Sequence, residues 1–252
     1  MILNNQYLKI FVKFIMGSLN LFFDENLIKK KIFPFDSLSR ISIKDEFFTP
    51  SAVLFTIIPY KDKPYEFVLI HRTDKGLKHR GEMSFPGGKF DNNHDNSLKD
   101  TALREAEEEI GVPREGVKIM GCLHDFPTMS QYIITPFIGI IKKDQKLIKQ
   151  EREVQAIVKV PIDFFVSRKN FKEQSFNIIG KELPVFYFNY YDKITSKKYT
   201  IWGATAFMIV SFIELLYNLK MSKLGIRRFN IDEIKDLKDF LLYRNQINEN
   251  LK

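Results

Sequence analysis

The 252 residues can bury one full hydrophobic core, and 44% hydrophobic with 28% charged residues is ordinary for a soluble globular protein. The single cysteine, Cys122, excludes an internal disulfide and a cysteine-rich zinc site, and it fits a cytoplasmic location because the cytoplasm is reducing. The net charge of +8 suits an anionic partner, but the lysines are scattered and form no long basic arm, so we expect no specific nucleic acid partner.

The first residues of the chain are apolar, as in a membrane span or a targeting signal. Lys9 and Lys13 interrupt them, so the apolar stretch is too short to span a bilayer or to form the core of a signal peptide. Two interpretations of these residues stay open: they form an amphipathic helix, or the protein starts at Met16. We expect no transmembrane segment and three parts: an N-terminal extension over 1–48, a catalytic domain over 49–222 and a C-terminal helical extension over 223–252.

Periodicity along the chain predicts the main elements. Apolar and β-branched runs predict strands over residues 51–59, 66–72, 117–123, 132–142, 154–160 and 184–190. Helical spacing predicts helices over 97–110 and from 203 to about 219, a short helical turn at 161–167 and a terminal helix within 226–252. Strands mixed with two main helices indicate an α/β (α+β) protein, an α/β/α sandwich around a mixed β-sheet.

The first long helix has a recognisable start, end and buried stripe. Asp95, Asn96 or Ser97 can cap its start, and Gly111 can end it with Pro113 just beyond. Its apolar residues recur every four positions, at Leu98, Ala102, Ala106 and Ile110. This spacing predicts a helix that packs one face against the sheet.

Three carboxylates lie on the arc beside this stripe, behind a Pro-Gly-Gly turn. Residues three and four apart are neighbours on a helix, so Glu105 lies next to Glu108 and Glu109, and Arg104 can pair with Glu108. Crowded carboxylates repel one another unless a cation joins them, and Mg²⁺ or Mn²⁺ prefers oxygen ligands together with substrate phosphates. A solvated charged face is the alternative, but the ordered pattern behind the glycine turn favours a site for divalent metal and phosphate.

The run from residue 85 to residue 112, FPGGKFDNNHDNSLKDTALREAEEEIGV, resembles the signature of the Nudix hydrolases, a Gly followed at a distance by Arg-Glu-x-x-Glu-Glu-x-Gly. The usual signature has a Glu eight positions before the Arg; here that position is Asn96, and Asp91 and Asp95 are the nearest acids. This form of the loop resembles the coenzyme A pyrophosphatase branch. Further segments that resemble this branch, between about 50 and 217, are Leu69–Thr73, Lys78–Ser84, Pro127–Thr128, Thr135–Gly139, Glu153–Val154, Val160–Pro161 and Ile201–Ala206.

The resemblance implies a Nudix fold and metal-dependent hydrolysis of the diphosphate in a nucleoside diphosphate derivative, first of all coenzyme A or an acyl-coenzyme A, giving 3′,5′-ADP and (acyl-)phosphopantetheine. The branch usually has an Arg where this chain has Leu77 between Lys75 and Lys78, and an ammonium does not reproduce the planar grip of a guanidinium. One alternative is therefore a Nudix diphosphatase for NADH, ADP-ribose or nucleoside triphosphates. The other is a non-catalytic module that binds nucleotide or RNA, against which the retained glutamates argue.

The resemblance also implies roles for individual side chains. Glu105, Glu108 and Glu109 are expected to bind Mg²⁺ or Mn²⁺, and Arg104 to orient them. The residues expected to bind substrate are Arg72, Lys78, His79, Gly87, Gly88 and Lys89. The general base is open among Glu109, Glu151 and Glu153, and the number of metal ions and the formation of a homodimer are open as well. The expected partner is a small-molecule nucleoside diphosphate.

Overall fold

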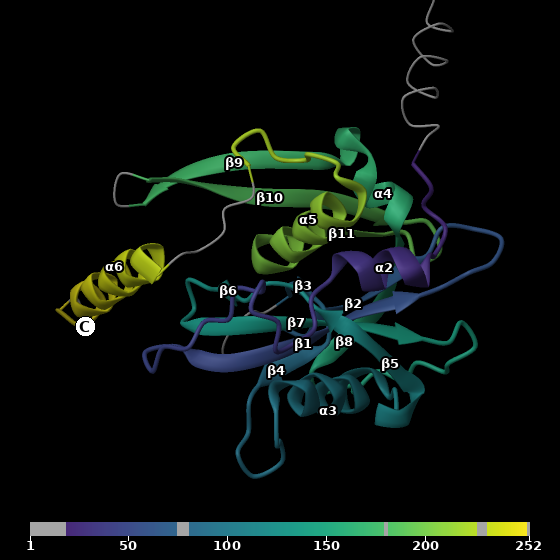
Figure 1. Cartoon of the computed structure of the whole chain (residues 1–252), viewed down its shortest axis with the longest axis horizontal. Coiled ribbons are helices and arrows are strands. Elements are labelled where there is room, and N and C mark those ends of the chain that lie inside the picture. Colours follow the sequence, from purple (N-terminus) through teal and green to yellow (C-terminus); the bar gives the residue numbers. More distant parts are fainter. Residues whose placement is uncertain (1–18, 75–80, 179–180, 226–230, 251–252) are drawn as a thin grey trace, which may run out of the picture.

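The computed structural model describes residues 19–74, 81–178, 181–225 and 231–250. Eight strands form one mixed sheet in the order β3-β2-β1-β7-β5, with β4 on β1, β6 on β7 and β8 on β2 (Figure 1). These strands are β1 (Thr49–Ile58), β2 (Glu66–Arg72), β3 (Met83–Ser84), β4 (Gly87–Lys89), β5 (Val117–Cys122), β6 (Phe126–Pro127), β7 (Tyr132–Ile141) and β8 (Val154–Pro161). β1 and β7 run parallel, and β1 pairs antiparallel with β2 and β4. The five strands predicted over this part of the chain are confirmed.

The main sheet lies between two helices, α3 (Leu98–Ile110) on one face and α5 (Gly203–Tyr217) on the other (Figure 1). Ala102, Ala106 and Ile110 of α3 are fully buried in one hydrophobic cluster with β1 and β2 residues. Phe212 of α5 packs on Phe55 of β1, with ring centroids 4.9 Å apart. Because helices cover both faces, β1 reads as an almost continuous apolar run. The predicted α/β/α sandwich around a mixed sheet is confirmed.

A second, three-stranded antiparallel sheet covers the outer side of α5. Its strands are β9 (Phe171–Ile178), β10 (Lys181–Asp192) and β11 (Lys197–Trp202), in the order β11-β10-β9. Phe186 of β10 stacks on Phe207 of α5, with centroids 5.9 Å apart. The sequence predicts one strand here, at 184–190, and that count is wrong. The sequences of β9 and β11 contain many polar residues because one face of this sheet is exposed, which weakens their strand signal.

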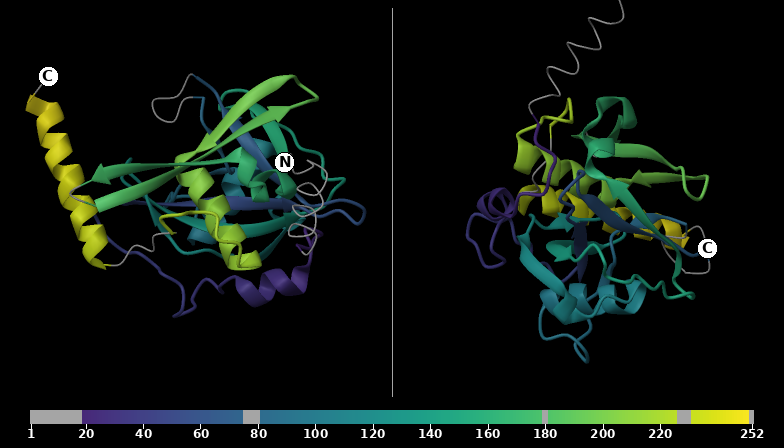
Figure 2. Two further views of the ribbon diagram at one scale, coloured as in Figure 1. Left: turned by 90° about the horizontal axis from the view of Figure 1, so that it is seen from above. Right: turned by 90° about the vertical axis from the view of Figure 1, so that its right-hand side faces the viewer.

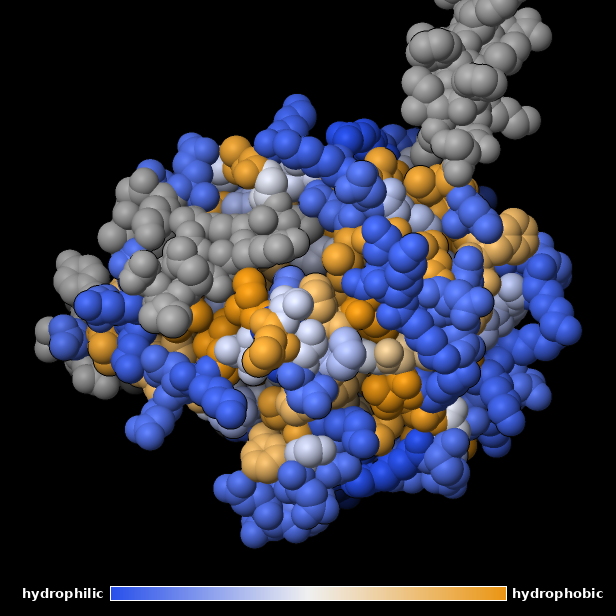
Figure 3. Space-filling view, viewed as in Figure 1, coloured by the Kyte–Doolittle hydropathy of each residue, from blue (hydrophilic) through white to orange (hydrophobic). Residues whose placement is uncertain are grey.

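Residues 24–48 pack into the same body as the sheets. Helix α2 (Glu25–Lys31) buries Ile28 in the cluster of α5, and Phe33 forms an antiparallel bridge with Cys122. Arg40 makes an ion pair with Asp125 in which both side chains are buried. This part of the predicted extension over 1–48 shares the core, and the domain boundaries themselves stay predictions. Apolar residues gather toward the middle of the face shown in Figure 3, with hydrophilic residues around them.

The remaining helices are short or terminal. Helix α4 (Ile162–Val166) confirms the helical turn predicted at 161–167. Helix α6 (Ile231–Asn250) packs Ile234, Leu237 and Leu241 into a small cluster with Phe48 and Ile133. Across the described ranges, no helix is long and apolar enough to cross a membrane.

Candidate active site

Helix α3 presents its charged side chains to β2 and β4 because its ends and its buried stripe fix its rotation. Ser97 is the N-cap, and its Oγ accepts a hydrogen bond from the Asp100 N–H at 3.2 Å. Gly111 is the C-cap in the left-handed conformation, with φ of 68°. Since Ala102 and Ala106 face the sheet, Arg104, Glu105, Glu108 and Glu109 lie beside the packed stripe, as predicted.

The two glycines of β4 let the backbone pass directly against the carboxylates of α3. A Cβ atom on Gly88 would lie 2.3 Å from Glu105 Oε1, and one on Gly87 would lie 2.5 Å from the carbonyl oxygen of Ala52. The Gly87 N–H donates a hydrogen bond to Glu109 Oε2 at 2.9 Å. Any other residue at these positions would move either the carboxylate or the strand.

Glu109 is the most buried carboxylate of this group, with a side chain that is 2% exposed. Its Oε1 accepts a hydrogen bond from Arg72 Nη1 at 2.9 Å, and Oε2 is bound to Gly87. Burial raises the pKa of Glu109 to about 8, although the Arg72 guanidinium acts in the opposite direction. Glu109 can therefore hold or release a proton near neutral pH.

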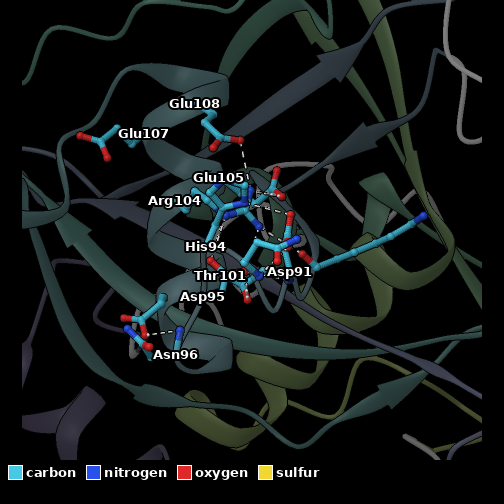
Figure 4. A network of polar contacts seen from close by, with 12 residues as sticks. Asp91, His94, Asp95, Asn96, Thr101, Arg104, Glu105, Glu107 and Glu108 are labelled. Atoms are coloured by element: carbon cyan, nitrogen blue, oxygen red, sulfur yellow. Dashed lines mark hydrogen bonds and ion pairs between the residues drawn. The ribbon is translucent and has the colours of Figure 1, made fainter.

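Arg104 is the centre of a polar network that joins α3 to the loop before it (Figure 4). Its Nη1 donates to Glu105 at 2.8 Å and to Glu108 at 3.1 Å, which confirms the predicted pairing with Glu108. Its Nη2 also donates to the carbonyl oxygen of Lys89 at 3.1 Å. Glu107 points away from this network (Figure 4) and lies 3.6 Å from Arg114. One guanidinium thus fixes two of the three predicted metal ligands.

Asp95 is the partner of Arg104 in the loop; the sequence offered it as a possible cap and as a nearby acid, but did not predict this pairing. Its side chain is fully buried and accepts hydrogen bonds from Arg104 Nε and Nη2, both at 2.9 Å. Thr101 Oγ1 and the Asp91 N–H also donate to it, at 2.8 and 3.0 Å. The Arg104 guanidinium lowers the pKa of Asp95 to about 2. Asp95, one residue before Asn96, therefore provides the buried carboxylate that holds Arg104.

Glu153 lies at the edge of the site, and Glu151 pairs elsewhere. Glu153 Oε2 is 3.9 Å from Arg72 Nη2, and the Glu153 side chain is 55% exposed. Glu151 lies 2.9 Å from Lys149. Of the two loop glutamates proposed as a base, only Glu153 has a contact with a site residue among those the structure describes. The sequence signal that could have favoured it is its position directly before the predicted strand at 154–160, which is β8 and pairs with the strand of Arg72.

The donor chemistry of these side chains fits a divalent cation, because Glu105, Glu108 and Glu109 all offer carboxylate oxygens. Burial raises the pKa of Glu105, and the charges of Glu108 and Glu153 add to this effect, so a cation among them would be favourable. In the described ranges, however, no three His, Cys, Asp or Glu side chains are arranged to enclose an ion. Each of the three glutamates is bound to an arginine. Their assignment as metal ligands stays a prediction.

The predicted substrate-binding residues are only partly placed. Arg72, Gly87 and Gly88 meet at Glu109 and Glu105, whereas the Lys89 side chain is exposed beside them. The other two predicted substrate-binding residues, Lys78 and His79, lie outside the described residues. Their neighbours Lys75, Leu77 and Arg80, on which the choice of substrate was argued, lie outside them as well.

The family model of the NUDIX domain matches residues 49–179, which is more than half of the chain. The chain belongs to the Nudix hydrolase family. Proteins of this family generally use divalent metal cations. The match includes β1 to β8, α3 and every residue of the site described above.

Nudix relatives from plants and bacteria are similar over most of the chain. Nudix hydrolase 22, chloroplastic, of Arabidopsis thaliana is 32% identical over 69% of this chain and 61% of its own length. Nudix hydrolase 15, mitochondrial, of the same plant is 31% identical over 72% of this chain and 64% of its own length. The chain therefore spans less than two thirds of both plant relatives. The Nudix hydrolase NudL of Photorhabdus laumondii is 31% identical over 61% of this chain and 79% of its own.

Solved structures with the Nudix name are more distant in sequence. A MutT/nudix family protein from Enterococcus faecalis is 16% identical, with a TM-score of 0.43 over 86% of this chain and 84% of its own.

Proposed function

We propose that this Nudix protein is a divalent-metal-dependent diphosphatase that cleaves the diphosphate of a nucleoside diphosphate derivative, first of all coenzyme A or an acyl-coenzyme A. The products would be 3′,5′-ADP and (acyl-)phosphopantetheine. The observation that supports this best is Glu109, a buried carboxylate joined to Arg72 and to the Gly87 N–H at 2.9 Å each. Hydrolysis of a phosphoanhydride needs both proton transfer and stabilisation of negative charge. A carboxyl group, a guanidinium and a backbone N–H that meet at one point can provide both.

The side chains of the site divide the work. Arg72, with 27% of its side chain exposed, can contact a phosphate while it keeps Glu109 in place. Arg104 holds Glu105 and Glu108 through one nitrogen, Nη1. These three glutamates are the predicted ligands of Mg²⁺ or Mn²⁺, which when bound supplies Lewis-acid stabilisation of the diphosphate oxygens. The exposed Lys89 would add a point charge for phosphate.

We propose Glu109 as the first candidate for the general base and Glu153 as the second. Efficient proton transfer at neutral pH favours a group whose pKa lies near 7, and burial raises the pKa of Glu109 to about 8. Glu153 is exposed and lies 3.9 Å from Arg72, so it could reach a water from the other side of the guanidinium. Turnover of Glu153→Gln decides between them: a loss as large as that of Glu109→Gln would favour Glu153.

The test of substrate is a comparison of coenzyme A, dephospho-coenzyme A, NADH and ADP-ribose on the unmodified protein, each with Mg²⁺, Mn²⁺ or a chelator. Metal-dependent release of product from coenzyme A at the highest rate supports the proposal. Equal or higher rates on NADH and ADP-ribose would instead support a Nudix diphosphatase of broader specificity. This alternative is favoured by Leu77, which stands where the coenzyme A branch usually has an Arg. No turnover of any of the four would support the non-catalytic alternative.

A gain-of-function variant sharpens the substrate test. Leu77→Arg restores a guanidinium among Lys75, Lys78, His79 and Arg80 for the 3′-phosphate of coenzyme A. A charge-assisted contact contributes roughly 1.5–3 kcal/mol, so coenzyme A turnover should rise about tenfold or more. Leu77→Lys is the matched control, since it adds the charge without the planar fork. A rise that is equal for dephospho-coenzyme A would argue against recognition of the 3′-phosphate.

We also propose a cytoplasmic location. The support is compositional, because one cysteine in 252 residues suits a reducing compartment. Two relatives carry the words chloroplastic and mitochondrial in their names, so cell fractionation of the tagged full-length chain is the deciding measurement.

A further inference from the structure

The sheet of β9, β10 and β11 leaves one broad face exposed. Its inner face packs on α5 through Phe186, Phe188 and Ile201, all of which are almost completely buried. The opposite side of the sheet is turned away from α5, as the right-hand view of Figure 2 shows. We call it the outer face and define it by residues of the alternate register: Lys172, Phe176, Tyr187, Tyr191, Lys198 and Trp202.

Large aromatic side chains lie exposed on the outer face. Tyr187 and Trp202 are direct cross-strand partners, and their rings stack at 4° with centroids 6.1 Å apart. The exposed fractions are 42% for Trp202 and 48% each for Tyr191 and Phe176. Flat, exposed aromatic rings on a sheet form a platform on which planar bases can stack.

The charge of the outer face is positive. Lys172 is the register partner of Tyr187, and Lys198 is that of Tyr191, so each lysine stands beside an aromatic ring. None of the described outward positions carries an acidic side chain. The surrounding stretch, residues 167–225, has nine Lys and Arg against four Asp and Glu, a surplus of five of the chain's eight positive charges. Nine of the chain's 39 Lys and Arg in these 59 residues is the average density, so the positive surplus comes from the small number of acids.

We propose that the outer face binds single-stranded RNA without sequence preference, with bases on Tyr187 and Trp202 and phosphates at Lys172 and Lys198. Aromatic stacking interleaved with cations is how such strands are held, and a duplex offers no free base faces. A second copy of this chain fits less well, because a symmetric contact would set lysines against lysines with no acid to pair them. The inference goes beyond the proposed hydrolase function and does not depend on it.

The chain provides its own reporter for the test, since Trp202 is its single tryptophan. The full-length protein is titrated with uridine and adenosine homopolymers of about 12 nucleotides, within the usual site size for one such surface. Saturable quenching of tryptophan fluorescence, matched by anisotropy of a labelled strand, is the expected result. Duplex RNA of the same length should bind and quench less.

Two sets of variants separate stacking from charge. Tyr187→Ala should weaken binding about 5- to 150-fold, which corresponds to the loss of one base stack. Trp202→Phe keeps an aromatic ring and should bind nearly as well by anisotropy. Lys172→Ala with Lys198→Ala should reduce the slope of log affinity against log salt by about 1.4, because a single strand gives about 0.7 per phosphate contact.

The matched control is Lys30→Ala with Lys31→Ala, which removes the same charge from the exposed end of α2. It should leave the affinity and the salt slope nearly unchanged. The proposal is overturned if no strand binds at low salt, or if the control pair weakens binding as much as the outer-face pair. A dimer that the Tyr187 variant dissociates, with no RNA binding, would assign the face to a second copy instead. Melting temperature confirms that each variant is folded.

Discussion

Asp95 and Arg104 face each other through two parallel hydrogen bonds, Nε to Oδ1 and Nη2 to Oδ2, both 2.9 Å long. The remaining nitrogen of the same guanidinium holds Glu105 and Glu108. A buried acid of the loop therefore determines where two carboxylates of α3 lie, although it has no direct contact with either. This links the conformation of the loop after β4 to the geometry of the site.

We expect Asp95→Asn to weaken both the fold and the site. The amide cannot accept both guanidinium hydrogen bonds, and removal of one member of a buried pair costs about 3–5 kcal/mol. Because the pKa of Asp95 is lowered to about 2, its stabilisation is fully present above its ordinary value of 3.8 and is lost as the pH falls toward 2. The difference in unfolding free energy between the two proteins, measured with urea, should therefore shrink in that acidic range.

Asp95→Glu is the control for the position of the charge. It keeps the carboxylate but lengthens the side chain, so it should recover part of the stability and less of the turnover. Equal kcat for wild type and Asp95→Asn at a temperature where both are folded would refute the positioning role.

Alanine at Gly88 should mainly lower turnover, whereas alanine at Gly87 should mainly lower stability. A Cβ on Gly88 meets the carboxylate of Glu105, which is the end of a flexible side chain and can move away. Gly88→Ala should therefore cost under about 1 kcal/mol of stability but at least about tenfold in turnover. A Cβ on Gly87 meets the backbone of β1 at Ala52 and Val53, so Gly87→Ala should cost roughly 2–4 kcal/mol. Melting temperatures and kcat of both variants check the contrast; similar melting temperatures would contradict it.

Local patterns predicted the parts of this fold that depend on neighbours in the chain. The end of α3 at Gly111 and its buried stripe are set within a few residues and are confirmed, and its cap is Ser97, one of the three residues offered. The long apolar strands β1 and β7 were predictable because burial on both faces leaves a continuous apolar run.

The features that the sequence could not predict depend on how distant segments meet. The sequence offers Asp91 and Asp95 as the acids nearest to position 96, but only the fold of the loop shows that Asp95 reaches the guanidinium of Arg104. The pairing of Arg72 with Glu109 spans 37 positions. Lys172 and Lys198 look like scattered charges until β10 brings β9 and β11 into one sheet. These contacts depend on strand register and loop geometry, which hydrophobic periodicity does not predict.

Replacement of Arg40 tests whether residues 24–48 belong to the catalytic core. The Arg40 and Asp125 side chains are 2% and 3% exposed, and Asp125 also accepts hydrogen bonds from Thr135 and from the Ile43 N–H. Arg40→Leu would leave Asp125 buried without its cation, at a cost of about 3–5 kcal/mol in unfolding free energy.

Arg114→Leu is the matched control for Arg40, because Arg114 lies 3.6 Å from Glu107 and its side chain is 40% exposed. An exposed pair of this kind contributes about 0–1 kcal/mol. Similar urea midpoints for the two variants would show that residues 24–48 are attached only weakly.

Glu109→Gln should change activity and stability in opposite directions. Removing the charge should lower turnover by orders of magnitude, because Glu109 is both a predicted metal ligand and the first candidate base. Burial raises the pKa of Glu109 from 4.5 to about 8, so the folded protein binds this proton more tightly than the unfolded chain does. The contribution to stability is full below pH 4.5 and is lost as the pH rises through about 8.

The glutamine variant has no such proton to lose, and the comparison is made with a chelator present so that no cation compensates the charge. Its unfolding free energy relative to the wild type should rise between pH 4.5 and pH 8, by an amount on the order of a few kcal/mol. Glu108→Gln is the control, since the Glu108 side chain is 55% exposed and its neutralisation should change stability little at any pH. Both variants should lose turnover if both residues bind metal. Wild-type turnover of Glu109→Gln would remove Glu109 from the site, and a stability difference that does not vary with pH would show that its carboxylate is ionised without cost.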